Sequence, residues 1–140
     1  VAFAAEEIKL TGSRFYVDEA ALRGELDAVS GVVNLDCIGH GEKLYVLASP
    51  DALLGRGVEA ARSLGLLDRY ALETGPATGG VDSHWFAEKK VPVATVLHFP
   101  YDEYHLAGDL PELVDEQRMA DALALAAALV ESQLEQPLPR

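Results

Sequence analysis

Short apolar runs alternate with helix-like segments along this 140-residue chain, and this alternation constrains its fold more than any other feature. Runs typical of strands cover residues 1–5, 32–36, 44–48, 70–73 and 92–99. Segments typical of helices cover residues 11–26, 51–64, 82–89 and 111–134. Strands separated by helices usually form a parallel or mostly parallel sheet with helices on its faces. The sequence therefore predicts an α/β fold.

The first apolar run, residues 1–5, is predicted to be a buried strand near the centre of the sheet. The sequence opens inside this run, as expected for a piece cut from a longer domain that is incomplete at its N-terminus. A central strand with an exposed flank invites pairing with another chain. We therefore expect either the missing N-terminal part of the domain or a second copy to associate with the exposed sheet edge.

Two helices carry more specific expectations. In the segment 11–26, Phe15, Ala21 and Leu22 are expected to share the buried face. Ser49 or Asp51 is expected to cap the following helix, because both side chains can accept a hydrogen bond from its first turn.

Composition excludes several classes of function. Eleven Lys and Arg stand against 23 Asp and Glu, a formal net charge of -12, which disfavours binding to nucleic acids or to anionic membranes. The single cysteine excludes an internal disulfide and a multi-cysteine zinc cluster. No apolar run is long enough for a transmembrane helix, and no signal peptide is visible. The length favours a single domain over residues 1–135, followed by a tail over 136–140.

Residues with metal-binding chemistry follow three of the predicted strands. Glu6 and Glu7 follow the first, Asp36 ends the second, and Tyr104 and His105 lie in the loop after residues 92–99. Ligands gather at the carboxyl ends of parallel strands, so these side chains are expected to converge. A His with carboxylates and no thiolate is typical of a catalytic zinc site. Each residue can also belong to a solvated loop, which is the usual role of a charged pair such as Glu6 and Glu7, whereas Asp after an apolar strand more often has a partner. Spacing alone does not decide between the two.

Four segments resemble the signature motifs of zinc-dependent aminopeptidases of the M28 type, in the order of that family. Residues 1–8 with 12–14 resemble "AxEExGLxGS", and residues 33–39 resemble "NLDMIG". Residues 82–86 with Val91 and Pro92 resemble "SDHxxFxxxGIP". Tyr104, His105, Asp109, Glu112 and Val114 resemble "YHTxxDxxExVD". The resemblance spans nearly the whole chain, and it implies the mostly parallel α/β fold of zinc exopeptidases.

The resemblance implies a role for each matching residue. Glu6 matches the general base that takes a proton from a metal-bound water. Glu7 and His105 match ligands of one zinc ion, and Asp36 matches a ligand of the second. Tyr104 matches a tyrosine that hydrogen-bonds the developing oxyanion in some members, which a phenol donor can stabilise.

The third motif is expected to shape the substrate pocket through Asp82, Ser83 and His84. Their order inverts the family's usual Ser-Asp-His. Three further positions depart from the family pattern: Lys9 replaces Gly, Thr11 replaces Leu, and Cys37 replaces Met.

The largest departure concerns the ligands that the family places before the Glu-Glu pair. These are a His in an "HxD" motif and an Asp that bridges two metals, and neither occurs in the five residues before Glu6. One zinc therefore keeps Glu7 and His105, and the other keeps only Asp36. A complete site is expected to hold two zinc ions, whereas the isolated chain is expected to hold them partially or not at all and to be inactive.

Three hypotheses for function follow. The first is the C-terminal part of a zinc aminopeptidase acting on peptides. The second is a glutaminyl-cyclase-like acyltransferase that uses a single zinc, for which Glu6, Glu7 and His105 are also suitable. The third is a non-catalytic relative with the same fold. The family is often exported, and the sequence does not indicate a compartment.

Overall fold

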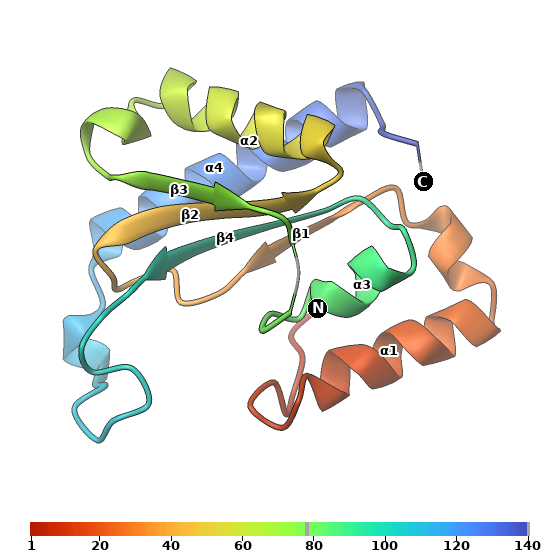
Figure 1. Ribbon diagram of the computed structural model, residues 1–140, viewed down its shortest axis with the longest axis horizontal. Coiled ribbons are helices and arrows are strands. Elements are labelled where there is room, and N and C mark those ends of the chain that lie inside the picture. Colours follow the sequence, from red (N-terminus) through yellow and green to blue (C-terminus); the bar gives the residue numbers. More distant parts are fainter. Residues whose placement is uncertain (78, 140) are drawn as a thin grey trace.

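The computed structural model describes residues 1–77 and 79–139 (Figure 1). Its strands are β1 (Val32–Leu35), β2 (Lys43–Ser49), β3 (Leu72–Gly75) and β4 (Val93–Phe99). Its helices are α1 (Thr11–Leu22), α2 (Asp51–Ser63), α3 (His84–Glu88) and α4 (Glu116–Glu135). Short 3₁₀ turns lie at Glu25–Ala28, Leu66–Asp68 and Pro111–Leu113. Among the described residues, no helix is long and apolar enough to cross a membrane.

The four strands form one sheet in the order β1-β4-β2-β3. The pairs β1/β4 and β2/β3 are parallel, whereas β2/β4 is antiparallel. Helices α2 and α4 cover one face of the sheet, and α1 and α3 cover the other (Figure 1). The prediction of a mostly parallel sheet flanked by helices is therefore confirmed.

Strand β4 carries both halves of the core because it is buried on both faces. Ala94 and Val96 point into the cluster under α2 and α4, together with Leu125 and Leu129. Val93 points into the smaller cluster under α1 and α3. A strand that is buried on both faces has a continuous apolar sequence rather than an alternating one, and residues 92–99 show this pattern.

The N-terminal residues 1–5 are not a strand, which corrects the sequence prediction. Val1 is 95% exposed, and Phe3 instead packs edge-on against Tyr16, with ring centroids 5.5 Å apart. A strand persists only where neighbouring backbone takes up its hydrogen bonds. Within the described part of the chain, residues 1–5 make no backbone hydrogen bond to β1, and β1 and β3 are the edges of the sheet.

The buried face of α1 also differs from the expectation. Ser13, Val17 and Ala20 are buried, whereas Phe15 and Leu22 are exposed. The buried residues follow the i, i+4, i+7 spacing of one helical face. The expected set of Phe15, Ala21 and Leu22 does not hold, because Val17 and Ala20 are the residues that pack in the cluster with Phe86 and Val93.

Two helix starts need correction. Neither Ser49 nor Asp51 caps α2, because Pro50 occupies its N-cap position without a side-chain hydrogen bond. Pro111 begins a 3₁₀ turn instead of the last helix, and α4 starts at Glu116. There Asp115 is the cap, accepting a hydrogen bond of 2.9 Å from the backbone N–H of Arg118.

The burial of His98 on the α4 side of β4 predicts that the stability of the fold depends on pH. Its Nδ1 donates to the carbonyl oxygen of Ile38 at 2.9 Å, while Nε2 is buried without a hydrogen-bond partner among the described residues. Burial lowers the pKa of His98 below its ordinary value. The unfolded chain therefore takes up a proton first, so stability is full above about pH 6.5 and falls as the pH drops below it. The melting temperature should therefore be lower at pH 5.5 than at pH 7.5. In the His98→Gln variant the difference between these two melting temperatures should be smaller.

Candidate functional site

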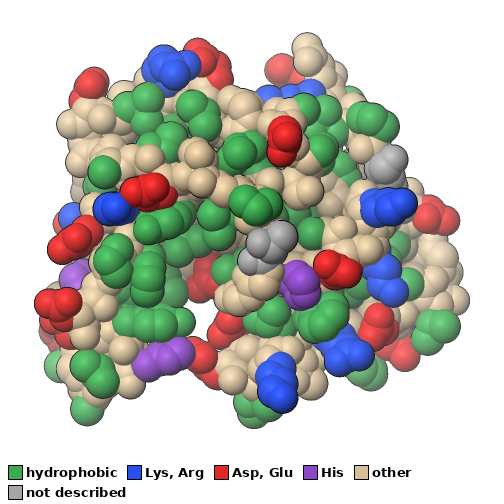
Figure 2. Space-filling view, in the orientation of Figure 1, with side chains coloured by type: hydrophobic (Ala, Val, Ile, Leu, Met, Phe, Trp, Pro, Cys, Tyr) green, Lys and Arg blue, Asp and Glu red, His purple; other side chains and the backbone are tan. Residues whose placement is uncertain are grey.

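Three loops meet at the end of the sheet where β1 and β4 finish. Asp36 directly follows β1, Tyr104 lies in the loop after β4, and Glu6 and Glu7 lie in the turn before α1. Together they border a pocket of about 200 Å³. Its lining residues are Glu6, Glu7, Asp36, Cys37, Gly80, Val81, Leu97, Phe99 and Tyr104. Figure 2 shows a hollow in this region, with acidic side chains and a histidine at its rim.

Glu7 and His105 meet across this pocket although they are 98 positions apart. His105 Nε2 lies 2.8 Å from Glu7 Oε1 and donates a hydrogen bond to it. The imidazole also stacks on the ring of Tyr104, with centroids 3.9 Å apart. His105 has a positive φ of 60°, a left-handed conformation that is uncommon for a residue other than glycine. The fold thus holds a histidine nitrogen and a carboxylate oxygen within hydrogen-bond distance of each other.

Glu6 has an unusual electrostatic environment. Burial raises the pKa of Glu6, and the charges of Glu7, Asp36 and Asp82 raise it further, in that order. His105 acts in the opposite direction. A carboxylate whose pKa is raised in this way is a stronger base when it is ionised.

Local hydrogen bonds hold the Glu6-Glu7 turn. The backbone N–H of Leu10 donates to the carbonyl of Glu6 at 2.8 Å, and that of Thr11 donates to the carbonyl of Ala5 at 3.2 Å. Ala5 and Leu10 both adopt positive φ angles. The turn therefore presents two adjacent carboxylates to the pocket from a constrained backbone.

Three side chains beside the acids remain protonated. Burial raises the pKa of Tyr104, and the nearby Cys37 and Glu7 raise it further, so its hydroxyl keeps its proton for donation. Burial and the charge of Asp36 raise the pKa of the Cys37 thiol to about 12, which leaves it a poor nucleophile. Burial also raises the pKa of Tyr101, whose hydroxyl donates to Asp109 Oδ2 at 3.3 Å.

Asp82, Ser83 and His84 are not among the residues that line this pocket, to which Gly80 and Val81 just before them contribute; their role in shaping a substrate pocket stays a prediction. Ser83 is buried, and its hydroxyl bonds that of Thr95 at 2.7 Å. His84 Nδ1 accepts a hydrogen bond from the backbone N–H of Gly79. The negative charge of Asp82 helps to raise the pKa of Glu6.

The pocket also has an apolar side. Phe99, which the sequence offers as a candidate for an apolar lining together with Trp85, Phe86 and Tyr101, does line this pocket. Leu97 and Cys37 line it as well, and the sequence interpretation did not single them out. The alternation of side chains along a strand could have identified Leu97, because residues two apart share a face.

The donors have the chemistry that zinc prefers, but they are too few for a complete site. Glu7 and His105 are a pair, and Asp36 instead accepts a hydrogen bond of 3.3 Å from Cys37 Sγ. Within residues 1–77 and 79–139, no group of three or more His, Cys, Asp or Glu side chains could hold a metal ion. Catalytic zinc sites usually take three protein ligands, so the described residues do not complete one.

Comparisons with known proteins support the motif resemblance. A family model described as peptidase family M28 matches residues 1–130. A structure of BSAP, a zinc aminopeptidase from Bacillus subtilis, matches with a TM-score of 0.77 and 27% identity over 94% of this chain. The aminopeptidase from Aneurinibacillus sp. strain AM-1 matches with a TM-score of 0.73 and 24% identity over 94% of this chain. No curated protein matched the sequence.

A third structure shares the fold at lower identity. Acidobacteriales bacterium glutaminyl cyclase matches with a TM-score of 0.73 and 21% identity over 88% of this chain. This chain spans 34% of the Bacillus subtilis protein, 32% of the Aneurinibacillus protein and 45% of the cyclase. The similarity therefore concerns a part of each relative.

Proposed function

The chain belongs to peptidase family M28, and we propose that it supplies part of the active site of a zinc-dependent aminopeptidase. One observation carries this proposal: the 2.8 Å contact between His105 Nε2 and Glu7 Oε1, at a pocket that Glu6 and Asp36 also border. Two segments far apart in sequence have no structural need to bring an imidazole and several carboxylates together at the surface.

In this proposal each of these residues has a separate role in binding zinc or in catalysis. Glu7 and His105 would hold one zinc ion, and Asp36 would contribute to a second. Zinc, when bound, polarises a carbonyl and makes water a stronger acid. Glu6 would accept the proton that the attacking water loses, and the protonated Tyr104 would donate a hydrogen bond to the developing oxyanion. The acidic pocket also suits the positively charged amino terminus of a peptide.

We further propose that the remaining zinc ligands, a His and a bridging Asp, come from polypeptide outside these 140 residues. The relatives are two to three times longer than this chain, which leaves room for them. The isolated chain should then be inactive.

The test is hydrolysis of amino-acid anilides with added zinc. The isolated chain should give only the background rate, and Glu6→Gln should leave that rate unchanged. The complete gene product containing this sequence should hydrolyse them, and Glu6→Gln there should lower kcat by about 10²- to 10⁴-fold while retaining zinc. Robust turnover by the isolated chain, lost on Glu6→Gln, would show that its site is complete. A complete gene product that binds no zinc would favour the non-catalytic relative.

A second candidate reaction is the cyclisation of N-terminal glutamine. The glutaminyl cyclase structure and the Aneurinibacillus aminopeptidase match this chain with the same TM-score. We therefore retain cyclisation as the second candidate. Aminopeptidase activity ranks first because the Bacillus subtilis enzyme has the higher identity to this chain. Peptides that begin with glutamine distinguish the two: a cyclase releases ammonia and leaves the peptide bond intact, whereas an aminopeptidase releases free glutamine.

A further inference from the structure

We propose that His40 is a positioning residue, which holds the loop of residues 101–110 and so fixes where Tyr104 and His105 lie at the pocket. His40 comes one position after the motif at residues 33–39. The catalytic part of this proposal rests on the proposed function. Its structural part, the position of the His105 ring, can be measured without any turnover.

The turn that carries His40 is held on both sides by the start of α4. The backbone N–H of Asp115 donates to the carbonyl of Gly39 at 2.8 Å. Arg118 Nη1 donates to the carbonyl of Gly41 at 2.6 Å. These are the residues immediately before and after His40. Its side chain therefore projects from backbone that the rest of the fold keeps in place.

His40 contacts the loop through two side chains. Its Nε2 donates to Glu103 Oε2 at 3.3 Å, across 63 positions of the sequence. Its ring also packs edge-on against Tyr101, with centroids 4.8 Å apart. Tyr101 and Glu103 are half-buried, whereas Asp102 between them is exposed. Alternate residues at the start of the loop thus face His40.

The contact with Glu103 bears directly on the site because Glu103 begins a tight turn. The backbone N–H of Leu106 donates to the carbonyl of Glu103 at 2.8 Å. This bond closes a four-residue turn whose two central residues are Tyr104 and His105. A side chain that fixes Glu103 therefore also fixes the backbone that presents the phenol and the imidazole.

A series of ring contacts provides a second connection from His40 to His105. Tyr101 packs against Tyr104 with centroids 5.5 Å apart, and Phe99 of β4 packs against Tyr104 at 5.3 Å. Tyr104 in turn stacks on His105. Aromatic pairs at these distances have preferred relative orientations. A displacement of Tyr101 is therefore passed on to Tyr104 and to the His105 ring.

The turn is thus held at two points, by Glu7 through His105 and by His40 through Glu103. Without His40 the turn can pivot about the remaining contact. A misplacement of about 1 Å can lower a reaction rate roughly 100-fold. Because Tyr104 would donate its hydrogen bond to the transition state and not to the bound substrate, the loss should appear in kcat and not in KM.

NMR of this chain tests the structural part. His40→Ala and Glu103→Ala should each shift the ring signals of His105 and abolish the nuclear Overhauser effect between that ring and the Glu7 side chain. Glu103→Gln keeps an acceptor oxygen for His40 Nε2, so it should restore both signatures. Thermal unfolding of each variant gives its stability.

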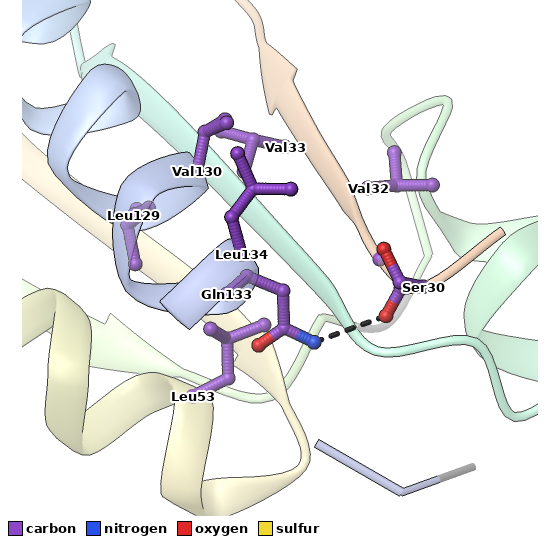
Figure 3. A pocket seen from close by; sticks show the side chains of 9 residues that line it. Ser30, Val32, Val33, Leu53, Leu129, Val130, Gln133 and Leu134 are labelled. Atoms are coloured by element: carbon purple, nitrogen blue, oxygen red, sulfur yellow. Dashed lines mark hydrogen bonds between the residues drawn. The ribbon is translucent and has the colours of Figure 1, made fainter. Parts of the chain in front are cut away.

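Gln133→Ala is the matched control. Gln133 Nε2 donates to the carbonyl of Ser30 at 3.0 Å, in a pocket of about 150 Å³ between α4 and the start of β1 (Figure 3). This variant also removes a hydrogen bond between distant segments, but at the end of β1 away from the loop. It should lower stability and leave the His105 signals in place.

The catalytic part is tested in the complete gene product containing this sequence. His40→Ala and Glu103→Ala should lower kcat about 10- to 100-fold with KM little changed, and Glu103→Gln should recover most of the rate. A complete product that never hydrolyses amino-acid anilides contradicts the proposed function alone, since the NMR result still decides whether His40 positions the loop.

Unchanged His105 signals in both His40→Ala and Glu103→Ala would overturn the proposal. An equal displacement of His105 in Gln133→Ala would overturn it too, because any loss of stability would then have the same effect. An active product whose kcat is unaffected by His40→Ala would overturn the catalytic part.

Discussion

Asp121→Ala should lower the free energy of unfolding by about 2–3 kcal/mol, because it removes a buried carboxylate that accepts two hydrogen bonds and pairs with the half-exposed Arg69. Asp121 is a buried carboxylate on the inner side of α4. Its Oδ2 accepts from the Tyr70 hydroxyl at 2.7 Å and lies 2.7 Å from Arg69, and its Oδ1 accepts from Gln117 at 2.9 Å. These contacts join α4 to the turn before β3.

Urea unfolding measures the loss, and two variants calibrate it. Asp121→Asn keeps the side-chain volume and one acceptor oxygen but removes the charge and the second acceptor, so it should cost less than the alanine variant. Glu59→Ala removes the exposed ion pair with Arg62 and should change stability by no more than about 0.5 kcal/mol. If Asp121→Ala and Glu59→Ala have equal effects, the network does not hold α4.

The same network predicts how stability depends on acid. Burial alone would raise the pKa of Asp121, but hydrogen bonds from Tyr70 and Gln117 and the charge of Arg69 hold it below its ordinary value. The folded state therefore resists protonation at a pH where the unfolded chain accepts it. This stability is present above the ordinary aspartate pKa of about 3.9 and is lost as the pH falls below it. Asp121→Asn should lack this part of the acid transition.

Gly12→Ala should cost about 1–3 kcal/mol and should displace the turn that carries Glu6 and Glu7. A Cβ atom at Gly12 would lie 2.0 Å from the carbonyl oxygen of Ala4, a backbone atom that cannot rotate away. The segment from Ala4 to Glu7 must then move as a unit. The contact between Glu7 and His105 should weaken, because it depends on the position of this turn.

Gly55→Ala provides a control of opposite sign. Gly55 lies inside α2 with open space around its Cα, so alanine there should stabilise the chain by about 0.5–1 kcal/mol. Urea unfolding gives both energies, and NMR of the histidine rings reports on the site. In Gly12→Ala the His105 signals should shift and those of the buried His98 should not. Unchanged His105 signals would mean that the close approach of Gly12 does not position the turn.

Local sequence patterns, namely apolar runs and turn residues, predict most of the helices and strands. Apolar and β-branched runs predict strands β1, β2 and β4, and Gly65, with a positive φ of 69°, follows the end of α2. These signals are read within a few residues, since periodicity and turn chemistry act locally. Asp36 and Tyr104 border one pocket as expected from the rule that strand ends share an edge, whereas Glu6 reaches it from a turn before α1 and not from the predicted strand.

The sequence by itself thus determined the α/β class, the family resemblance and the residues that can carry chemistry. Only the tertiary structure decided that residues 1–5 stay unpaired, that β2 runs antiparallel to β4, and that Ser83 is buried against Thr95. It also decided the direct hydrogen bond between Glu7 and His105, two residues that the family resemblance assigns to one zinc ion. The physical reason is the range of the interactions. Propensity and periodicity depend on neighbours along the chain, whereas pairing and burial depend on neighbours that only the folded chain brings together.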